Sequence, residues 1–115
     1  MLYNGSQNTE RQEHENMVSP QVEEVLLRVQ KPGRYTGGEL NSVTKKLDDV
    51  AVRFAFCFPD LYEVGMSHLG MKILYGQFNN EPDVWCERVF APWLDMQEQM
   101  VAHNLPLTTL ESGDN

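Results

Sequence analysis

The sequence VAVRFAFCF at residues 50–58 runs directly into PDLYEVGMSHLG at residues 59–70, and the fold class that we expect rests on this stretch. The first part is apolar except for Arg53, a pattern typical of a β-strand that is covered on both faces. Pro59 and Asp60 end this strand. Residues 67–78 then predict a helix, because apolar residues that should face inward recur at helical spacing: Leu69, Ile73, Leu74 and Phe78.

Further elements are expected on both sides of this stretch. Residues 20–30 predict an amphipathic helix with Ser19 as its N-cap, and residues 84–90 predict a second strand. Residues 92–103 predict another helix and residues 107–110 a short third strand. The helix at 92–103 should turn Trp93, Met96 and Met100 inward, with Leu94 as a further candidate.

The alternating order of these elements indicates an α/β fold with right-handed crossovers. We expect a partial doubly wound sheet, Rossmann-like or flavodoxin-like, with three parallel strands and flanking helices. Residues 1–19 are polar and without periodicity, so they predict a disordered tail. Three strands are few for such a sheet, so residues 20–115 are expected to form a truncated α/β domain.

The composition excludes several classes of protein. The 115 residues carry 9 Lys and Arg against 17 Asp and Glu, a net charge of −8, which argues against nucleic-acid binding. No apolar run reaches the ~18–20 residues that cross a bilayer, and no secretory signal is recognisable, so we expect no membrane partner and a cytoplasmic location. Cys57 and Cys86 are expected to be buried, inert thiols in neighbouring strands of a protein from a reducing compartment.

The turn at residues 59–70 follows the carboxyl end of a strand, where open parallel sheets place their ligands. Gly65 and Gly70 would let the backbone approach a ligand, and Ser67 would cap the following helix. An ordinary strand-to-helix connection explains the same residues equally well. The G-x-x-x-x-G spacing is followed by Met71 and Lys72 rather than Lys-Ser/Thr, so it is not a phosphate-binding loop.

No metal site is expected from the sequence. His68 is expected to be solvated or hydrogen-bonded rather than a ligand, and two cysteines in separate elements cannot hold zinc or an iron–sulfur cluster. Glu87 and Arg88 interrupt the second strand with charge, which suggests a strand near the sheet edge or a pair that points at a partner. Residues 31–42, KPGRYTGGELNS, predict a loop with unusual backbone angles at Gly33, Gly37 or Gly38.

Four blocks of the sequence resemble the N-terminal, cobalamin-binding-like domain of a large family of radical SAM proteins. They are KPGRYTGGELNSV at 31–43, FCFPDLYEVGMSHLG at 56–70 with KILY at 72–75, CERVFAPWLDM at 86–96, and LPL at 105–107 with LES at 110–112. Together these blocks span about residues 24–112.

The resemblance implies that the catalytic parts lie elsewhere. Radical SAM chemistry needs Cys-x-x-x-Cys-x-x-Cys, which the family carries downstream and this sequence lacks, so the iron–sulfur cluster and S-adenosylmethionine are expected only in a full-length parent. The family's cobalamin-type fold would allow a cobalamin, but the sequence lacks the Asp-x-His-x-x-Gly triplet that supplies a histidine ligand. No cofactor is therefore expected in this chain alone.

Three functions follow from the resemblance. The first is a non-catalytic N-terminal domain or fragment of a radical SAM protein; the second is a stand-alone module that docks on a separate radical SAM chain; the third is a small-ligand, cobalamin-like binding domain. The residues that would bind a cofactor are Asp60, Gly65, Ser67, His68 and Gly70. The residues that would face a partner, such as the catalytic domain in cis or in trans, are Arg34, Tyr35, Gly37, Gly38, Glu39 and Asn41.

Overall fold

The computed structural model describes residues 19–115, so the predicted disordered tail at 1–19 lies outside the described residues except for Ser19. Two parallel strands, β1 (Val52–Phe58) and β2 (Val84–Phe90), form the sheet, as the strand patterns at 50–58 and 84–90 predict. They pair in register from Val52 opposite Val84 to Phe58 opposite Phe90. The α/β class is thereby confirmed.

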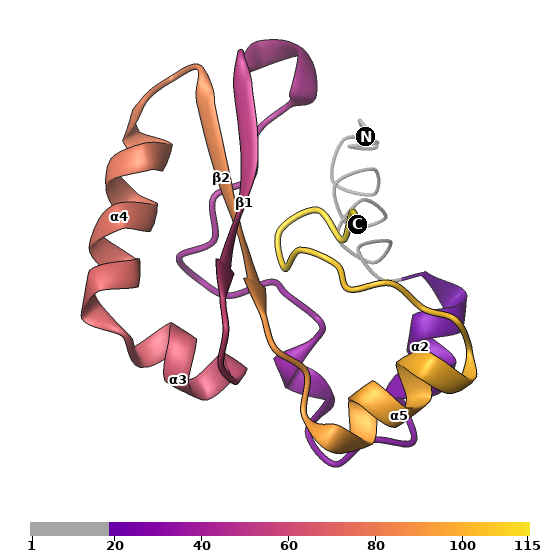
Figure 1. Ribbon diagram of the computed structural model, residues 1–115. Helices are drawn as coiled ribbons and strands as arrows, with labels where there is room; N and C mark the ends of the chain where they lie inside the picture. Colours follow the sequence, from indigo (N-terminus) through magenta and orange to yellow (C-terminus); the bar gives the residue numbers. More distant parts are fainter. Residues whose placement is uncertain (1–18) are drawn as a thin grey trace, which may run out of the picture.

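The connection between the two strands contains two helices, α3 (Tyr62–Ser67) and α4 (Leu69–Asn80). Figure 1 shows α4 running beside the strands, where it packs against β2. The core here is a cluster of Met71, Phe90 and Leu110, with four partly buried side chains around it: Phe56, Phe58, Tyr62 and Met66. This cluster joins α3, α4, both strands and the C-terminal segment.

A second, separate core lies between α2 (Pro20–Leu26) and α5 (Leu94–Ala102). Its buried residues are Val25, Leu26, Val29 and Met96. The predicted N-cap is confirmed, because the Ser19 hydroxyl accepts a hydrogen bond from the Val22 amide at 3.4 Å. Two short 3₁₀ turns, η1 (Pro32–Arg34) and η2 (Leu47–Asp49), lie in the connection from α2 to β1.

The predicted third strand at residues 107–110 is wrong, because this segment is irregular. It approaches β2 at a single backbone hydrogen bond, from the Leu110 amide to the Arg88 carbonyl at 2.9 Å. The Arg88 amide donates instead to the side-chain carboxylate of Glu111, at 2.7 Å. A side chain thus occupies the place of the next strand's carbonyl, and the sheet stops at two strands.

The expectation that β1 is covered on both faces is also wrong. Ala55 and Cys57 are exposed, because α2 and α5 pack on each other and leave this face of β1 open. Cys57 is therefore an exposed free thiol, contrary to prediction, whereas Cys86 is fully buried as expected. Burial raises the pKa of the Cys86 thiol to about 11, which keeps it protonated at neutral pH.

The inward face of α4 differs from the predicted one. Met71 and Tyr75 are buried, while Leu69 is 70% exposed and Ile73 50% exposed. A sheet of two strands offers too narrow a surface to cover every apolar residue of this helix. Trp93 is likewise 44% exposed and Leu94 63% exposed, although Met96 on the same predicted face is buried.

Among residues 19–115, no helix is both long enough and apolar enough to cross a membrane.

Replacing Gly65 by Ala should destabilise the fold by about 1–3 kcal/mol, because the added methyl group would overlap the ring of Phe90. Gly76→Ala is the matched control: it also adds a methyl group inside a helix, but nothing lies within 4 Å of it. This control should be neutral or stabilising by up to about 1 kcal/mol. Urea unfolding followed by circular dichroism measures both, and equal stabilities for the two variants would contradict the packing seen at Gly65.

Candidate functional site

The predicted ligand-binding turn at 59–70 contains helix α3. Ser67 ends this helix, and its hydroxyl donates to the Glu63 carbonyl at 2.8 Å. The expected cap of α4 is therefore wrong: His68, not Ser67, caps it, because its Nδ1 accepts a hydrogen bond from the Met71 amide at 3.1 Å. Its ring lies 5.0 Å from that of Phe58, measured between centroids.

The other residues predicted to bind a cofactor also contact the fold itself. The Asp60 side chain accepts from the Leu61 amide at 2.7 Å, and its carbonyl accepts from the Ala91 amide at 2.9 Å. Gly65 lets α3 approach Phe90, and Gly70 lies beside the His68 ring. These contacts explain the residues structurally, while their role in cofactor binding stays a prediction.

The loop at 31–42 packs against the 59–70 turn. The Arg34 Nε donates to the Glu63 carboxylate at 2.8 Å, and the Tyr62 hydroxyl donates to Glu39 at 3.0 Å. The hydrogen bond from Arg34 lowers the pKa of Glu63, and burial raises the pKa of Tyr62 to about 12. The two segments singled out by sequence are thus neighbours in space.

Two glycines of the loop have the unusual backbone angles that the sequence predicts. Gly37 has φ of 66° and Gly38 has φ of 77°, a region that favours glycine. A side chain at Gly37 would also overlap the carbonyl of Leu110, so the loop passes close to the C-terminal segment. The Tyr35 hydroxyl accepts from the Trp93 amide at 3.0 Å, which ties the loop to the start of α5.

A cavity of about 310 Å³ lies where the loop, α3, α4 and β2 meet. Asn41, from the predicted partner-facing set, and Gly65, from the predicted cofactor set, both line it. Arg88 forms part of its wall from β2. The structure thus brings one residue of each predicted set to a single cavity.

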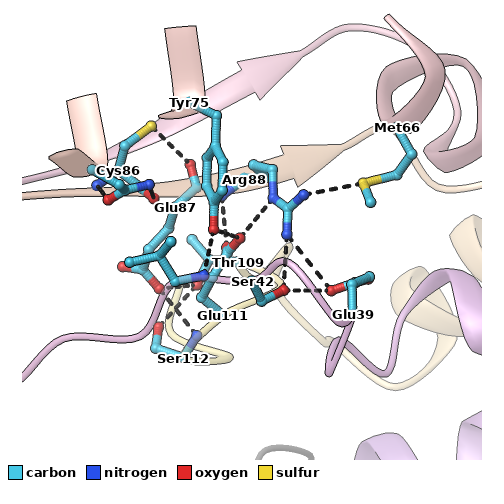
Figure 2. A network of polar contacts seen from close by, with 12 residues as sticks. Glu39, Ser42, Met66, Tyr75, Cys86, Glu87, Arg88, Thr109, Glu111 and Ser112 are labelled. Atoms are coloured by element: carbon cyan, nitrogen blue, oxygen red, sulfur yellow. Dashed lines mark hydrogen bonds and ion pairs between the residues drawn. The ribbon is translucent and has the colours of Figure 1, made fainter. Parts of the chain in front are cut away.

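Arg88 is the centre of a buried polar network (Figure 2). Its Nε donates to Glu111 at 2.7 Å, its Nη2 donates to the Ser42 hydroxyl at 2.9 Å, and the Glu39 carboxylate lies 3.7 Å from Nη2. The guanidinium also stacks on the Tyr75 ring, 4.2 Å from its centroid. The Tyr75 hydroxyl in turn donates to Glu111 at 3.0 Å.

Glu87 forms a second buried cluster on the opposite face of β2. It accepts from the Arg53 Nε at 2.5 Å, from the Thr109 hydroxyl at 2.8 Å and from the Ser112 amide at 3.1 Å. Burial raises the pKa of Glu87, but these hydrogen bonds lower it by more. The net result is a pKa below the usual value for a glutamate, so the buried carboxylate is ionised at neutral pH. Both clusters fasten the C-terminal segment to β2.

The sequence signal for these clusters was the charged pair Glu87 and Arg88 inside an apolar strand. The prediction of an edge strand is confirmed, but both side chains bind partners within residues 19–115. Buried charges need such partners, so the pair itself indicates that matching charges exist elsewhere in the chain. Nothing local marked Glu111 or Ser42 as those partners.

Within the described residues, no three His, Cys, Asp or Glu side chains gather in a way that would hold a metal ion. The cavity at Arg88 presents hydrogen-bond donors.

Glu111→Ala should cost about 3–5 kcal/mol of unfolding free energy, because it leaves the Nε and the backbone amide of Arg88 buried without an acceptor. Glu98→Ala removes an exposed carboxylate from α5 and should change stability by less than about 0.5 kcal/mol. Both values come from urea unfolding. A loss below about 1 kcal/mol for Glu111→Ala would show that the network does not hold the fold.

Comparison with known proteins gives one match. A family model described as "Radical SAM proteins, N-terminal" matches residues 70–115, which is less than half of the chain. No curated protein and no solved structure matches the sequence. The matched segment contains Tyr75, Arg88 and Glu111, whereas Glu39 and Ser42 lie outside it. Over residues 70–115 the chain is similar to the N-terminal domain of radical SAM proteins, and a cobalamin-binding role stays a prediction.

Proposed function

We propose that residues 20–115 act as a non-catalytic docking domain of a radical SAM protein, which pairs along β1 with an extended segment of the catalytic domain, in cis or in trans. The family match at residues 70–115 supports the class of partner. The observation that carries the proposal is the contrast between the two edges of the sheet: within residues 19–115, one edge is capped by side chains and the other is not.

The outer edge of β2 is closed by groups from other elements. The Cys86 amide donates to the Asn79 side chain at 2.9 Å, and the Cys86 carbonyl accepts from that same side chain at 3.0 Å. The Arg88 amide donates to Glu111, and the Arg88 carbonyl accepts from the Leu110 amide. The Val84 carbonyl accepts from the Lys45 ammonium. This edge offers no free backbone groups at these residues.

Within residues 19–115, the backbone groups along the outer edge of β1 are not closed in this way, as the register of the two strands shows. Cys86 and Arg88 turn their backbone groups away from β1, so in this parallel register the alternate residues of β1 turn theirs away from β2. These outward residues are Arg53, Ala55 and Cys57. Within residues 19–115 their backbone groups have a single contact, a weak one from the Cys57 thiol to the Ala55 carbonyl at 3.8 Å. Monomeric proteins normally protect such an edge.

An apolar flank lies next to this open edge. Asn79 of α4 reaches the outer edge of β2, so the opposite side of the helix, with Leu74 and Phe78, lies toward β1. Phe78 packs edge-on against Phe54 of β1 with ring centroids 5.1 Å apart, yet both Phe78 and Leu74 remain more than one-third exposed. A strand added to β1 would form backbone hydrogen bonds and cover these side chains together.

The end of the described chain lies close to the same strand. The Asp114 carboxylate accepts from the Arg53 Nη2 at 2.6 Å, on the open face of β1.

Cobalamin binding has weaker support. Cavities of ~300–1,000 Å³ accommodate drug-sized molecules, and cobalamin is much larger than these, so the 310 Å³ cavity at Arg88 does not fit it. The Nδ1 of His68 is occupied as a helix cap. We derive no role for a cobalamin from these residues.

The test is complex formation with the radical SAM catalytic domain encoded together with this sequence, expressed as a separate chain. Ala55→Pro removes one outward amide from β1, and Leu74→Asp places a charge on the apolar flank; each should weaken the complex at least about tenfold. Light scattering after size exclusion should show a one-to-one complex. Labelling of the exposed Cys57 by N-ethylmaleimide should slow on binding.

Leu27→Asp is the matched control, since Leu27 is 87% exposed on the turn after α2, outside this flank. It should bind as tightly as the unmodified chain. Circular dichroism checks that each variant is folded. A folded Ala55→Pro variant with unchanged affinity, or binding that leaves Cys57 labelling unaltered, would contradict docking through β1.

A further inference from the structure

We propose that the cavity lined by Asn41, Lys72 and Arg88 binds a small organic carboxylate with an apolar body. This site is separate from the β1 edge, because it lies on the other side of α4, toward the loop that precedes β1. The inference therefore stands independently of the docking function.

The polar groups that line the cavity are rich in hydrogen-bond donors. Arg88 and Lys72 carry positive charge, Asn41 contributes an amide, and none of the lining residues from the described part of the chain is an Asp or Glu. Such a set is unexpected in a chain with a net charge of −8. Cationic donors around a cavity favour a ligand with a negatively charged acceptor.

The guanidinium of Arg88 has donor capacity left over. Its Nη1 carries two hydrogens, yet its partner among residues 19–115 is the thioether sulfur of Met66, at 3.3 Å. A thioether is a weak acceptor, and the Arg88 side chain is more than nine-tenths buried. Figure 2 shows the Nη1 end of the guanidinium directed at the Met66 sulfur, and both residues line the cavity. A buried donor of this kind favours an occupant that accepts hydrogen bonds.

The two neighbouring carboxylates hold Arg88 rather than block it. Glu111 binds Nε and Glu39 lies beside Nη2, so neither carboxylate occupies the Nη1 end of the guanidinium. Stacking on the Tyr75 ring further fixes its plane. An arginine fixed in this way is pre-organised for a carboxylate, since little side-chain entropy remains to be lost on binding.

The rest of the wall is apolar and limits the size of the ligand. It consists of two glycines and four larger residues: Gly65, Gly76, Val43, Met66, Met71 and Tyr75. The volume of about 310 Å³ is at the lower end for small-molecule sites. A short chain or a single aromatic ring that bears one carboxylate matches both the lining and the volume.

Phenylacetate is a suitable probe, with its neutral analogue phenylacetamide as the matched ligand. Titration of the ¹⁵N-labelled chain up to about 10 mM should give saturable NMR shifts at Gly65, Lys72 and Gly76. Phenylacetamide should bind at least about tenfold more weakly, because it lacks the charge that Arg88 and Lys72 recognise.

Two variants test the position of the site. Gly76→Leu places a side chain where a Cβ meets nothing within 4 Å, so it should fill the cavity and abolish the shifts. Gln77→Leu adds the same side chain at an exposed position of α4 and should bind phenylacetate normally. Lys72→Gln, at an exposed residue, should weaken binding of phenylacetate severalfold. This variant still tests the site if Gly76→Leu does not fold.

Several results would overturn the proposal. They are the absence of saturable shifts, equal binding of phenylacetate and phenylacetamide, and full binding by a folded Gly76→Leu variant. Unchanged binding by Lys72→Gln would equally exclude the charge recognition on which the proposal rests.

Discussion

The contact between Glu111 and Arg88 is the interaction on which the rest of this structure depends. One fully buried carboxylate accepts from the guanidinium and the backbone amide of Arg88 and from the Tyr75 hydroxyl. It thereby joins the C-terminal segment, β2 and α4. Two buried charges are tolerated only when hydrogen bonds satisfy them, and here each ionised group has several partners. The carboxylate also takes the position that a third strand would need, so the sheet remains two strands wide.

This arrangement makes the two edges of the sheet unequal. Asn79, Lys45 and Glu111 supply side-chain groups to β2, whereas nothing within residues 19–115 does the same for β1 beyond a weak thiol contact. The same network holds the Arg88 guanidinium at the wall of a cavity, with its Nη1 directed at the Met66 sulfur. The Arg88–Glu111 network therefore both closes part of the β2 edge and shapes the cavity.

Local patterns were sufficient for the features that depend on neighbours in sequence. The two strands, the Ser19 cap and the positive φ angles of Gly37 and Gly38 all followed from residue type and spacing. The prediction of a third strand at 107–110 was wrong because of a long-range contact. Glu111, 23 residues beyond Arg88, binds the Arg88 amide with its side chain. The predictions of the inward face of α4 and of a buried Cys57 were wrong for a related reason. Both depend on how much of the helix and of the sheet the other elements cover. Glu87 and Arg88 signalled that buried partners exist, but no local pattern identified them.

Hydrogen exchange of single backbone amides, followed by NMR in the isolated chain, tests the inequality of the two edges most directly. The amides of Cys86 and Arg88, which donate to Asn79 and Glu111, should be strongly protected. The amides of Ala55 and Cys57, which have no acceptor within residues 19–115, should exchange nearly as fast as in an unstructured peptide. Equal protection at all four positions would contradict the central claim, because it would mean that the β1 edge is already covered.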